Sequence, residues 1–383
     1  MAQKKVPDRP IAGVLSVIPG LGHLILGRRG RGIHLLASAG AIVLILFLRW
    51  EQFLSIFSSR DVGAWTASLF LIFSLAGSIA FSVMDVRRLP RAGEKARSRS
   101  PFAVAWRHFR AHRLAVAALY VIACLYLLAI LAPLLAPDDP AAIENVLATR
   151  YQPPSWNHLF GTDDFGRDLF SRALYGARVS LSVGLLAMIV AVFFGTLYGA
   201  VAGHFGGIVD SALMRVVDVI IAFPTFFLLL TLAGIFEANI VALVLILGFT
   251  SWTGTARLVR GEILSLKERE FVEGSRAIGL PSHLIIFRHL IPNALASVLV
   301  TAALMVGGMI GAEAGLSFLG IGIRPPTPSW GNMVSAGQDA LLVAWWIAFF
   351  PGCLLAITIL SFNLVADGLR DALDPKTLMR KYV

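Results

Sequence analysis

The chain has 383 residues, of which 57% are hydrophobic and 15% are charged, and its formal net charge is +10. Ordinary soluble domains carry about 25% charged residues, so this composition excludes a string of soluble domains. The excess of Lys and Arg does not indicate nucleic acid, because in membrane proteins it marks cytoplasmic loops and contacts with anionic lipid. We therefore expect an all-α, polytopic integral membrane protein, with membrane lipids and no nucleic acid among its partners.

Residues 1–90 are predicted to form an N-terminal membrane extension. The stretches 32–49 and 65–84 are long enough to cross a bilayer, which takes about 20 apolar residues. Residues 11–27 are apolar but broken by Pro and Gly, which favours a re-entrant or interfacial segment and leaves open whether it spans. Residues 91–113 follow as a basic cytoplasmic linker.

Residues 114–383 are predicted to form a second membrane domain with six spans. The basic N-terminus and linker stay in the cytoplasm, so an even number of spans separates them. Residues 137–178 then lie outside, residues 257–292 lie inside, and both termini are cytoplasmic. The six spans are predicted at about residues 114–136, 180–203, 212–235, 237–256, 293–319 and 341–366.

The sequence shows no pattern for catalysis, metal binding or nucleotide binding. No glycine-rich loop closes with Gly-Lys-Ser/Thr, so ATP hydrolysis has no visible site. His204, His283 and His289 lack the spacing of metal ligands. Neither a Ser-His-Asp nor an H-E-x-x-H arrangement is present. We expect no enzyme activity, no metal and no cofactor in this chain.

Ionisable residues within apolar runs are costly unless they are paired or hydrated. Glu313 either lines a water-filled path or reaches the interface from the outer end of its helix, and the sequence leaves both open. Arg215 and Asp218 are three residues apart on one helical face, which predicts a structural ion pair. In the stretch GTDDFGRD, residues 161–168, the pair Asp163 and Asp164 lies beside Arg167 and a predicted helix start. This pair is expected to cap the helix and order the loop rather than to serve in acid–base catalysis.

The segment 271–292, FVEGSRAIGLPSHLIIFRHLIP, is polar although it lies between two spans. Its first part predicts a short surface helix that ends at Gly279, because glycine fits a C-terminal cap and proline disfavours helix in its predecessor. A second short helix is expected from an N-cap at Ser282 up to Pro292. Small residues beside the single carboxylate of Glu273 suit docking into a groove, where an arginine can bind bidentately.

This segment resembles the E-A-A…G…I-x-L-P loop of permease subunits of binding-protein-dependent ABC importers. The matching residues are Glu273-Gly274-Ser275, Gly279 and HLIP at 289–292, with Gly and Ser for the two alanines and His289 for isoleucine. Three further stretches, 160–184, 210–230 and 313–337, resemble the C-type permease of the dipeptide/oligopeptide/nickel family. The resemblance covers about residues 101–383 and leaves the extension without a counterpart.

The resemblance implies a permease of the bacterial inner membrane that pairs with a homologous B-type permease. Two ATP-binding subunits would carry ATP and Mg²⁺, and an extracytoplasmic solute-binding protein would deliver a di- or oligopeptide or a related small solute. Loop 257–292 would couple the permease to the ATPases through Glu273, Gly274, Ser275, Ala277, Gly279 and Pro292. Asp163, Asp164, Arg167, Asp168 and Trp330 would form the periplasmic gate or the face met by the binding protein, with Glu313 as a possible pathway residue.

An ion-driven secondary transporter is the alternative function. That class predicts inverted repeats with broken helices and paired intramembrane carboxylates. The sequence shows no such repeat, and Glu313 has no second carboxylate beside it in its apolar run. The transported substrate is not decided by the sequence.

Overall fold

A computed structural model of the chain describes residues 101–143, 146–236 and 239–373, together with isolated positions 18, 33, 36, 37 and 40. The two predicted N-terminal spans, segment 11–27 and the tail after residue 373 lie outside the described stretches. The chain divides into two compact units, residues 1–99 with 130–135 and residues 100–129 with 136–383. The second, here called the main unit, holds every predicted site residue.

The described part of the chain is helical, and its only strand-type pairing is an isolated bridge between Thr162 and Asp168. The helices before the first long loop are α6 Pro101–Ala111, α7 Arg113–Ile130, α8 Ala132–Leu135 and α9 Val146–Thr149. They are followed by α10 Leu169–Phe205, α11 Gly207–Ala222, α12 Thr225–Ile235, α13 Ile240–Leu266 and α14 Glu270–Ala277. The last are α15 Ser282–Ile285, a π-helical turn Ile286–Leu290, α16 Ile291–Phe318, α17 Trp330–Gln338 and α18 Trp346–Leu373.

Among the described residues, five continuous helical stretches are long and apolar enough to span a membrane. A sixth is possible if α11 and α12 form one broken span. The predicted all-α, polytopic membrane fold is thereby confirmed. The five stretches are Arg113–Ile130, Leu169–Phe205, Ile240–Leu266, Ser282–Phe318 and Trp346–Leu373.

The span predicted over residues 212–235 is not one continuous helix. The structure has two helices, α11 and α12, bent by 82° at Phe223 and Pro224. Phe223 is extended (φ −82°, ψ 131°), as expected for a residue before proline, and Pro224 then precedes the first turn of α12.

Several helices also extend beyond the apolar runs that predicted them. Helix α10 begins at Leu169 rather than near 180, and α13 continues to Leu266 rather than 256. The added turns contain polar residues, which hydropathy leaves out although their backbone is helical. Helix α17 was not predicted. It begins with a capping box, in which Ser329 and Asn332 exchange side-chain hydrogen bonds with each other's backbone N–H.

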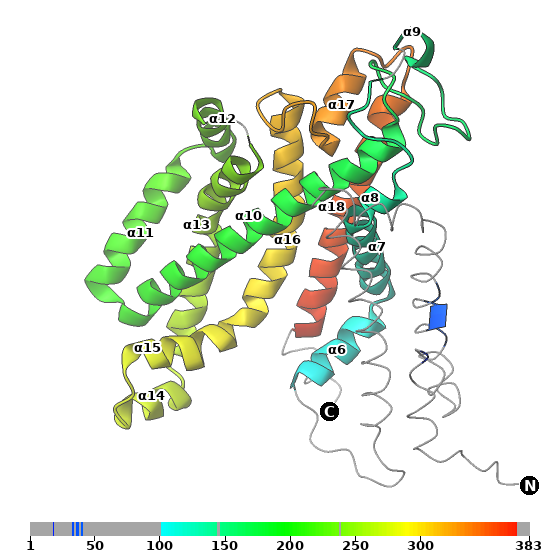
Figure 1. Cartoon of the computed structure of the whole chain (residues 1–383). Coiled ribbons are helices and arrows are strands. Elements are labelled where there is room, and N and C mark those ends of the chain that lie inside the picture. The colour runs from blue at the N-terminus through cyan, green and yellow to red at the C-terminus, as the bar shows by residue number, and fades with distance from the viewer. Residues whose placement is uncertain are drawn as a thin grey trace, which may run out of the picture. The chain divides into compact units, whose positions relative to one another are not determined.

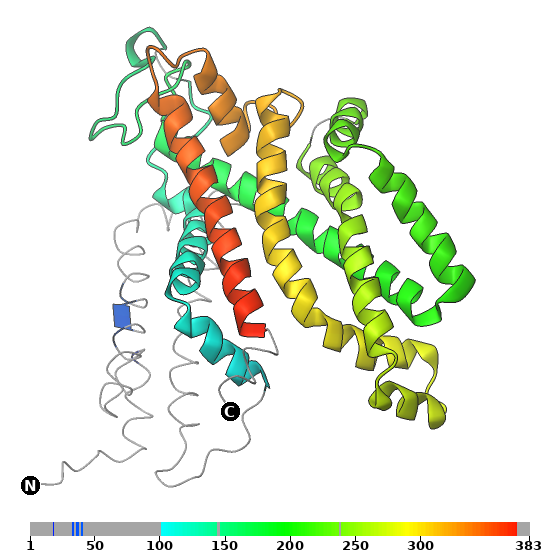
Figure 2. The same cartoon turned by 180° about the vertical axis from the view of Figure 1, so that it is seen from behind.

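Helix α10 is the central element of the main unit. It runs obliquely from the end that carries α9 and α17 toward the end that carries α14 and α15 (Figures 1 and 2). It packs along most of α13 and also against α16, which in turn packs against α18. The approach to α13 is so close that a Cβ at Gly199 would collide with the carbonyl oxygen of Ala256. Glycine is therefore required there for packing rather than for backbone freedom.

Three apolar clusters form the core of the main unit. The first joins α7, α10, α16, α17 and α18, and the second joins α10, α12, α13 and α16. The third lies among the ends of α10, α13 and α16 and includes Val272 of α14 and Ile285 of α15. This third cluster attaches the two short helices to the ends of long ones, and it fixes the position of the segment 271–292.

Candidate functional site

One face of α14 is fixed to the core of the main unit. Val272 has no exposed surface and Ser275 is 7% exposed, and the two lie three residues apart on the helix. Val272 packs in the cluster that contains Ile263 of α13 and Ile285 of α15. The Ser275 hydroxyl donates to the carbonyl of Phe271 at 2.7 Å. Helix α14 is therefore packed against α13 and α15 through its buried face.

The rest of α14 is exposed and carries most of the predicted coupling residues. Glu273, Gly274 and Ala277 are exposed, and a Cβ at Gly274 would have no neighbour within 4 Å. Within the described stretches, the Glu273 carboxylate has neither a hydrogen-bond nor an ion-pair partner. Ser275 does not share this surface, because its side chain faces the core.

The end of α14 follows the geometry expected from Gly279. That residue has φ +78°, which favours glycine. Its N–H donates to the carbonyl of Arg276 at 2.9 Å, and the Leu280 N–H donates to that of Ser275 at 3.1 Å. These two bonds form a Schellman motif, so the predicted helix stop is confirmed. The chain leaves α14 in a defined direction.

A second helix begins at Ser282, as predicted, but it does not end at Pro292, and Ser282 does not cap it. Pro281, not Ser282, is the N-cap of α15, and no side chain caps it. Helix α15, the π-helical turn and α16 form one continuous helical stretch from Ser282 to Phe318. Pro292 is exposed in the first turn of α16, where the missing N–H of proline is tolerated.

Exposed apolar side chains accompany the exposed face of α14. Phe271 is 41% exposed and Ile278 79%, and Phe287 in the π-helical turn is 58% exposed. Large apolar residues at a polar end of a protein indicate a contact surface when they gather near one another. We define the coupling surface as Phe271, Glu273, Gly274, Ala277 and Ile278.

The opposite end of the main unit carries the predicted gate residues, in the loop before α10. Asp163 accepts hydrogen bonds from the N–H groups of Phe165 and Arg167, both at 2.9 Å, and from Arg167 Nε at 2.7 Å. Arg172 Nε lies 3.5 Å from the same carboxylate. Asp163 and both arginines are buried. Asp163 therefore orders the loop, as predicted.

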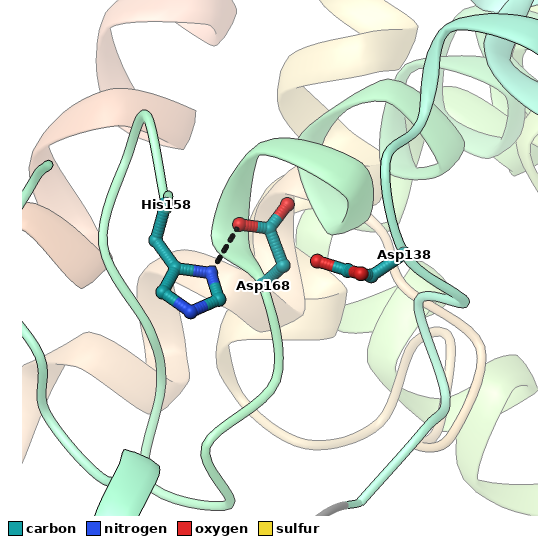
Figure 3. A group of neighbouring side chains, drawn as sticks. All are labelled: Asp138, His158 and Asp168. Carbon is teal, nitrogen blue, oxygen red and sulfur yellow. Dashed lines mark hydrogen bonds and ion pairs between the residues drawn. The ribbon is translucent and has the colours of Figure 1, made fainter. Parts of the chain in front are cut away.

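Asp168 is the N-cap of α10 and accepts the Ser171 N–H at 2.7 Å, so the helix is capped by Asp168 and not by the predicted pair Asp163 and Asp164. Its other oxygen lies 3.1 Å from His158 Nδ1, and Asp138 lies beside them (Figure 3). The sequence did not connect these three residues. The nearest signal was the proximity of His158 to the capping stretch 161–168.

Asp164 differs from its neighbours because its side chain is 34% exposed. Arg167 Nη2 lies 3.7 Å from Asp164 Oδ1, and that oxygen receives no hydrogen bond. Partial burial raises the pKa of Asp164, the charge of Asp163 adds to this, and Arg167 opposes it. Of the four ionisable gate residues, Asp164 alone remains accessible to an external partner.

Trp330, also predicted on the external face, is instead fully buried. Its Nε1 donates to the carbonyl of Ala173 at 3.0 Å, and its backbone N–H donates to Ser180 Oγ at 3.2 Å. The indole lies against α10, where a Cβ at Gly176 would be 3.2 Å from the ring. Trp330 joins α17 to α10 and offers no surface to an external partner in this conformation.

Glu313 follows neither of the two alternatives drawn from the sequence. It is 0% exposed, so it neither lines an open path nor reaches an interface in this conformation. Ser180 Oγ donates to Oε2 at 3.0 Å and Ser317 Oγ to Oε1 at 2.7 Å. Ser180 is 133 residues away in sequence, so periodicity could not reveal it. The network joins α10 to α16, and through the Trp330 N–H it reaches α17.

The predicted pair of Arg215 with Asp218 is wrong. Asp218 pairs with Arg257 of α13. Asp210 accepts hydrogen bonds from both Nε and Nη2 of Arg260, which is also on α13. Both pairs tie α11 to α13, and sequence reasoning missed them because the partners are 39 and 50 residues apart.

Two family models match the chain. Residues 195–379 match the binding-protein-dependent transport system inner membrane component. Residues 100–154 match the N-terminal TM domain of oligopeptide transport permease C. Together the two matches contain helices α6 to α9, the end of α10 and all helices from α11 to α18.

Curated relatives are similar over most of their own length. The chain is 39% identical over 273 residues to the dipeptide transport system permease protein DppC of Bacillus subtilis, covering 71% of this chain and 85% of the relative. It is 42% identical over 278 residues to the oligopeptide transport system permease protein OppC of Escherichia coli, covering 73% and 92%. It is 38% identical over 305 residues to a putative peptide transport system permease protein of Brucella abortus, covering 80% and 98%.

The segment 271–292 lies inside the larger matched region. The resemblance of the chain to permeases of this family is confirmed by these matches. The chain belongs to the family of binding-protein-dependent transport system inner membrane components, the permease subunits of ABC importers, and is a multi-pass protein of the inner membrane.

Proposed function

We propose that this chain is the C-type permease of an ATP-driven importer of di- or oligopeptides. The relatives in Bacillus subtilis and Escherichia coli are dipeptide and oligopeptide transport permeases, which supports a peptide substrate. The chain would form a translocation path together with a homologous B-type permease. A soluble binding protein would deliver the peptide from outside, and two ATP-binding subunits would bind ATP and Mg²⁺ on the cytoplasmic side.

The orientation follows from the basic residues of the linker, which favour the cytoplasm. With the linker and both termini inside, the end that carries α14 faces the cytoplasm. The end that carries the loop before α10 and α17 faces outward. The coupling surface then lies where ATP-binding subunits would dock.

The observation that carries the proposal is the two-sided construction of α14. Val272 and Ser275 hold the helix to the ends of α13 and α16, while Glu273 and Gly274 are exposed. A displacement of the exposed face would therefore move α13 and α16 together with α14. The free carboxylate of Glu273 can accept two hydrogen bonds from an arginine of the ATP-binding subunit, and the missing side chain at Gly274 allows a close approach.

Glu273→Lys is the test of this proposal. The substitution places a cation against the expected arginine, and we expect copurification of the ATP-binding subunits and peptide uptake each to fall at least about tenfold. The folded chain should be unaffected, because the side chain is exposed. Uptake of labelled peptide into cells or proteoliposomes and recovery of ATPase with the tagged permease measure the two effects.

Asp339→Lys is the matched control, because Asp339 is an exposed acidic residue at the opposite end of the main unit. It should leave ATPase recovery at the wild-type level. If Glu273→Lys also leaves recovery and uptake unchanged, the assignment of α14 as the coupling helix is wrong. Uptake of a non-peptide solute instead of peptides would refute the substrate class while leaving the coupling assignment intact.

A further inference from the structure

Two carboxylates and an imidazole meet at the start of α10, at the end of the main unit opposite α14 (Figures 1 and 3). Asp138 precedes α9, His158 lies in the loop between α9 and α10, and Asp168 is the N-cap of α10. One possible ligand atom from each of the three residues lies within 4.8 Å of the other two. The three segments are brought together by the fold and not by a sequence motif.

The three side chains line a cavity of about 80 Å³. A water molecule takes about 30 Å³ in the liquid, so this cavity has room for an ion and a water or two. Its remaining walls come from Asp139, Ala142, Thr149, Gly166 and Arg167.

Within the described stretches, neither Asp138 nor Asp168 pairs with a Lys or Arg side chain, and the side-chain partner of Asp168 is His158. Asp163 engages Arg167 at 2.7 Å and lies 3.5 Å from Arg172. Asp164 is the other acidic neighbour of Arg167, at 3.7 Å. In the described part of the chain, the carboxylate of Asp138 has no hydrogen-bond or ion-pair partner.

The ligand atoms are also held in place before any ion binds. Asp168 uses Oδ2 to accept the Ser171 N–H at 2.7 Å, which leaves Oδ1 directed toward His158 Nδ1 at 3.1 Å. The backbone N–H of Asp138 donates to Ser171 Oγ at 3.2 Å, so the same serine positions the second carboxylate. Such supporting contacts are typical of metal ligands, because they fix ligand orientation.

We propose that Asp138, His158 and Asp168 bind one divalent transition-metal ion, with Zn²⁺ as the best-fitting ion. One imidazole nitrogen and two carboxylate oxygens are ligands that Zn²⁺ accepts, at about 2.0–2.2 Å, with water in the fourth position. Ligand atoms around a tetrahedral Zn²⁺ are about 3.4 Å apart, so side-chain movements of about 1.5 Å or less bring the three atoms, which lie within 4.8 Å of one another, to that spacing. The bound ion would fasten residue 138 and the loop at residue 158 to the first turn of α10. This site is independent of the proposed transport role of α14.

The test is Zn²⁺ binding by the full-length chain, purified in detergent with its affinity tag removed and stripped of metal by a chelator. Competition with a fluorescent Zn²⁺ chelator gives the dissociation constant and the stoichiometry. We expect one Zn²⁺ per chain. We also expect Asp138→Asn and His158→Ala each to weaken binding at least about tenfold. Thermal unfolding with and without Zn²⁺ provides a second reading, because an ion that binds the folded state raises Tm.

Two variants serve as controls for unspecific binding. Asp339→Asn removes an exposed carboxylate that does not line the cavity, and His283→Ala removes an exposed histidine at the other end of the main unit. Both should keep the wild-type affinity and the wild-type increase in Tm. Absence of saturable binding would overturn the proposal. So would equal affinity in Asp138→Asn, which alters an exposed residue and leaves the cap of α10 in place.

Discussion

The two ends of the main unit use charged residues in opposite ways. At the end that carries α17, Asp163, Arg167 and Asp168 are 3–7% exposed and bonded to one another or to the backbone. At the α14 end, Glu273 is exposed and has no partner among the described residues. Both groups stand in polar stretches between apolar runs, so hydropathy alone treats them alike.

The difference shows that a polar interruption in a membrane protein can serve two physical purposes. A buried network in which every polar group is hydrogen-bonded fixes one loop conformation. Removing one member leaves its partners buried and unpaired, which lowers the stability of the fold. An exposed, unpaired charge contributes little to folding and is available for another molecule. Substitutions at the first end should therefore change stability, and substitutions at the second end should change assembly.

Trp330→Ala should give the largest loss of stability. The variant loses a fully buried indole and the hydrogen bond from Nε1 to Ala173, and we expect the free energy of unfolding to fall by about 3–5 kcal/mol. Trp156→Ala is the matched control, because that indole is 96% exposed and should change stability by less than about 0.5 kcal/mol. Denaturant unfolding in detergent compares the two. Equal losses would contradict the burial of Trp330.

Asp163→Ala should rank second. It leaves Arg167 and Arg172 without their shared carboxylate in a buried site, which typically costs about 3 kcal/mol or more. Glu273→Ala, at the other end, should remain within about 0.5 kcal/mol of wild type. The comparison of the two ends fails if these losses are similar in denaturant unfolding.

Two glycines of the α14 segment should respond in opposite directions. Gly279 has φ +78°, so Gly279→Ala is expected to destabilise the protein by about 1 kcal/mol. Gly274 lies within α14 with open space around its Cβ position, so Gly274→Ala should stabilise by up to about 1 kcal/mol. Thermal unfolding of both variants tests the assignment. A destabilising Gly274→Ala would show that α14 is packed on the side described as exposed.

The sequence was sufficient to predict features that depend on local backbone chemistry. Gly279 before Leu280 and Pro281 predicted the helix stop, and the stretch 161–168 predicted a capped helix start, although the cap is Asp168 rather than Asp163 or Asp164. The same rule was available for the break between α11 and α12, because Pro224 disfavours helix at Phe223. The apolar length of the run predicted a span over residues 212–235, and the break within it was not predicted.

Features that depend on partners distant in sequence could not be predicted in the same way. Glu313 stands alone in its apolar run, and only the packing of α10 against α16 supplies the hydroxyl of Ser180. Arg215 and Asp218 satisfy the spacing of a helical ion pair, but Arg257 of the adjacent helix binds Asp218 instead. Spacing predicts which residues share a face, and it does not determine what the neighbouring helix presents to that face.

Asp164→Asn should give the smallest effect, and it probes the one accessible residue among the acidic gate residues Asp163, Asp164 and Asp168. Partial burial and the charge of Asp163 raise the pKa of Asp164 above its ordinary value of 3.8 in the folded chain. Between the unfolded-state pKa and the higher folded-state pKa of Asp164, the folded state binds more protons than the unfolded state. The contribution of Asp164 to stability is therefore lost as pH rises through the folded-state pKa. We therefore expect Asp164→Asn to have a slightly higher Tm than wild type at neutral pH and no advantage below pH 3.8. A variant that is less stable than wild type at neutral pH would mean that the attraction of Arg167 exceeds the effect of burial, and that Asp164 belongs with the paired residues of its end.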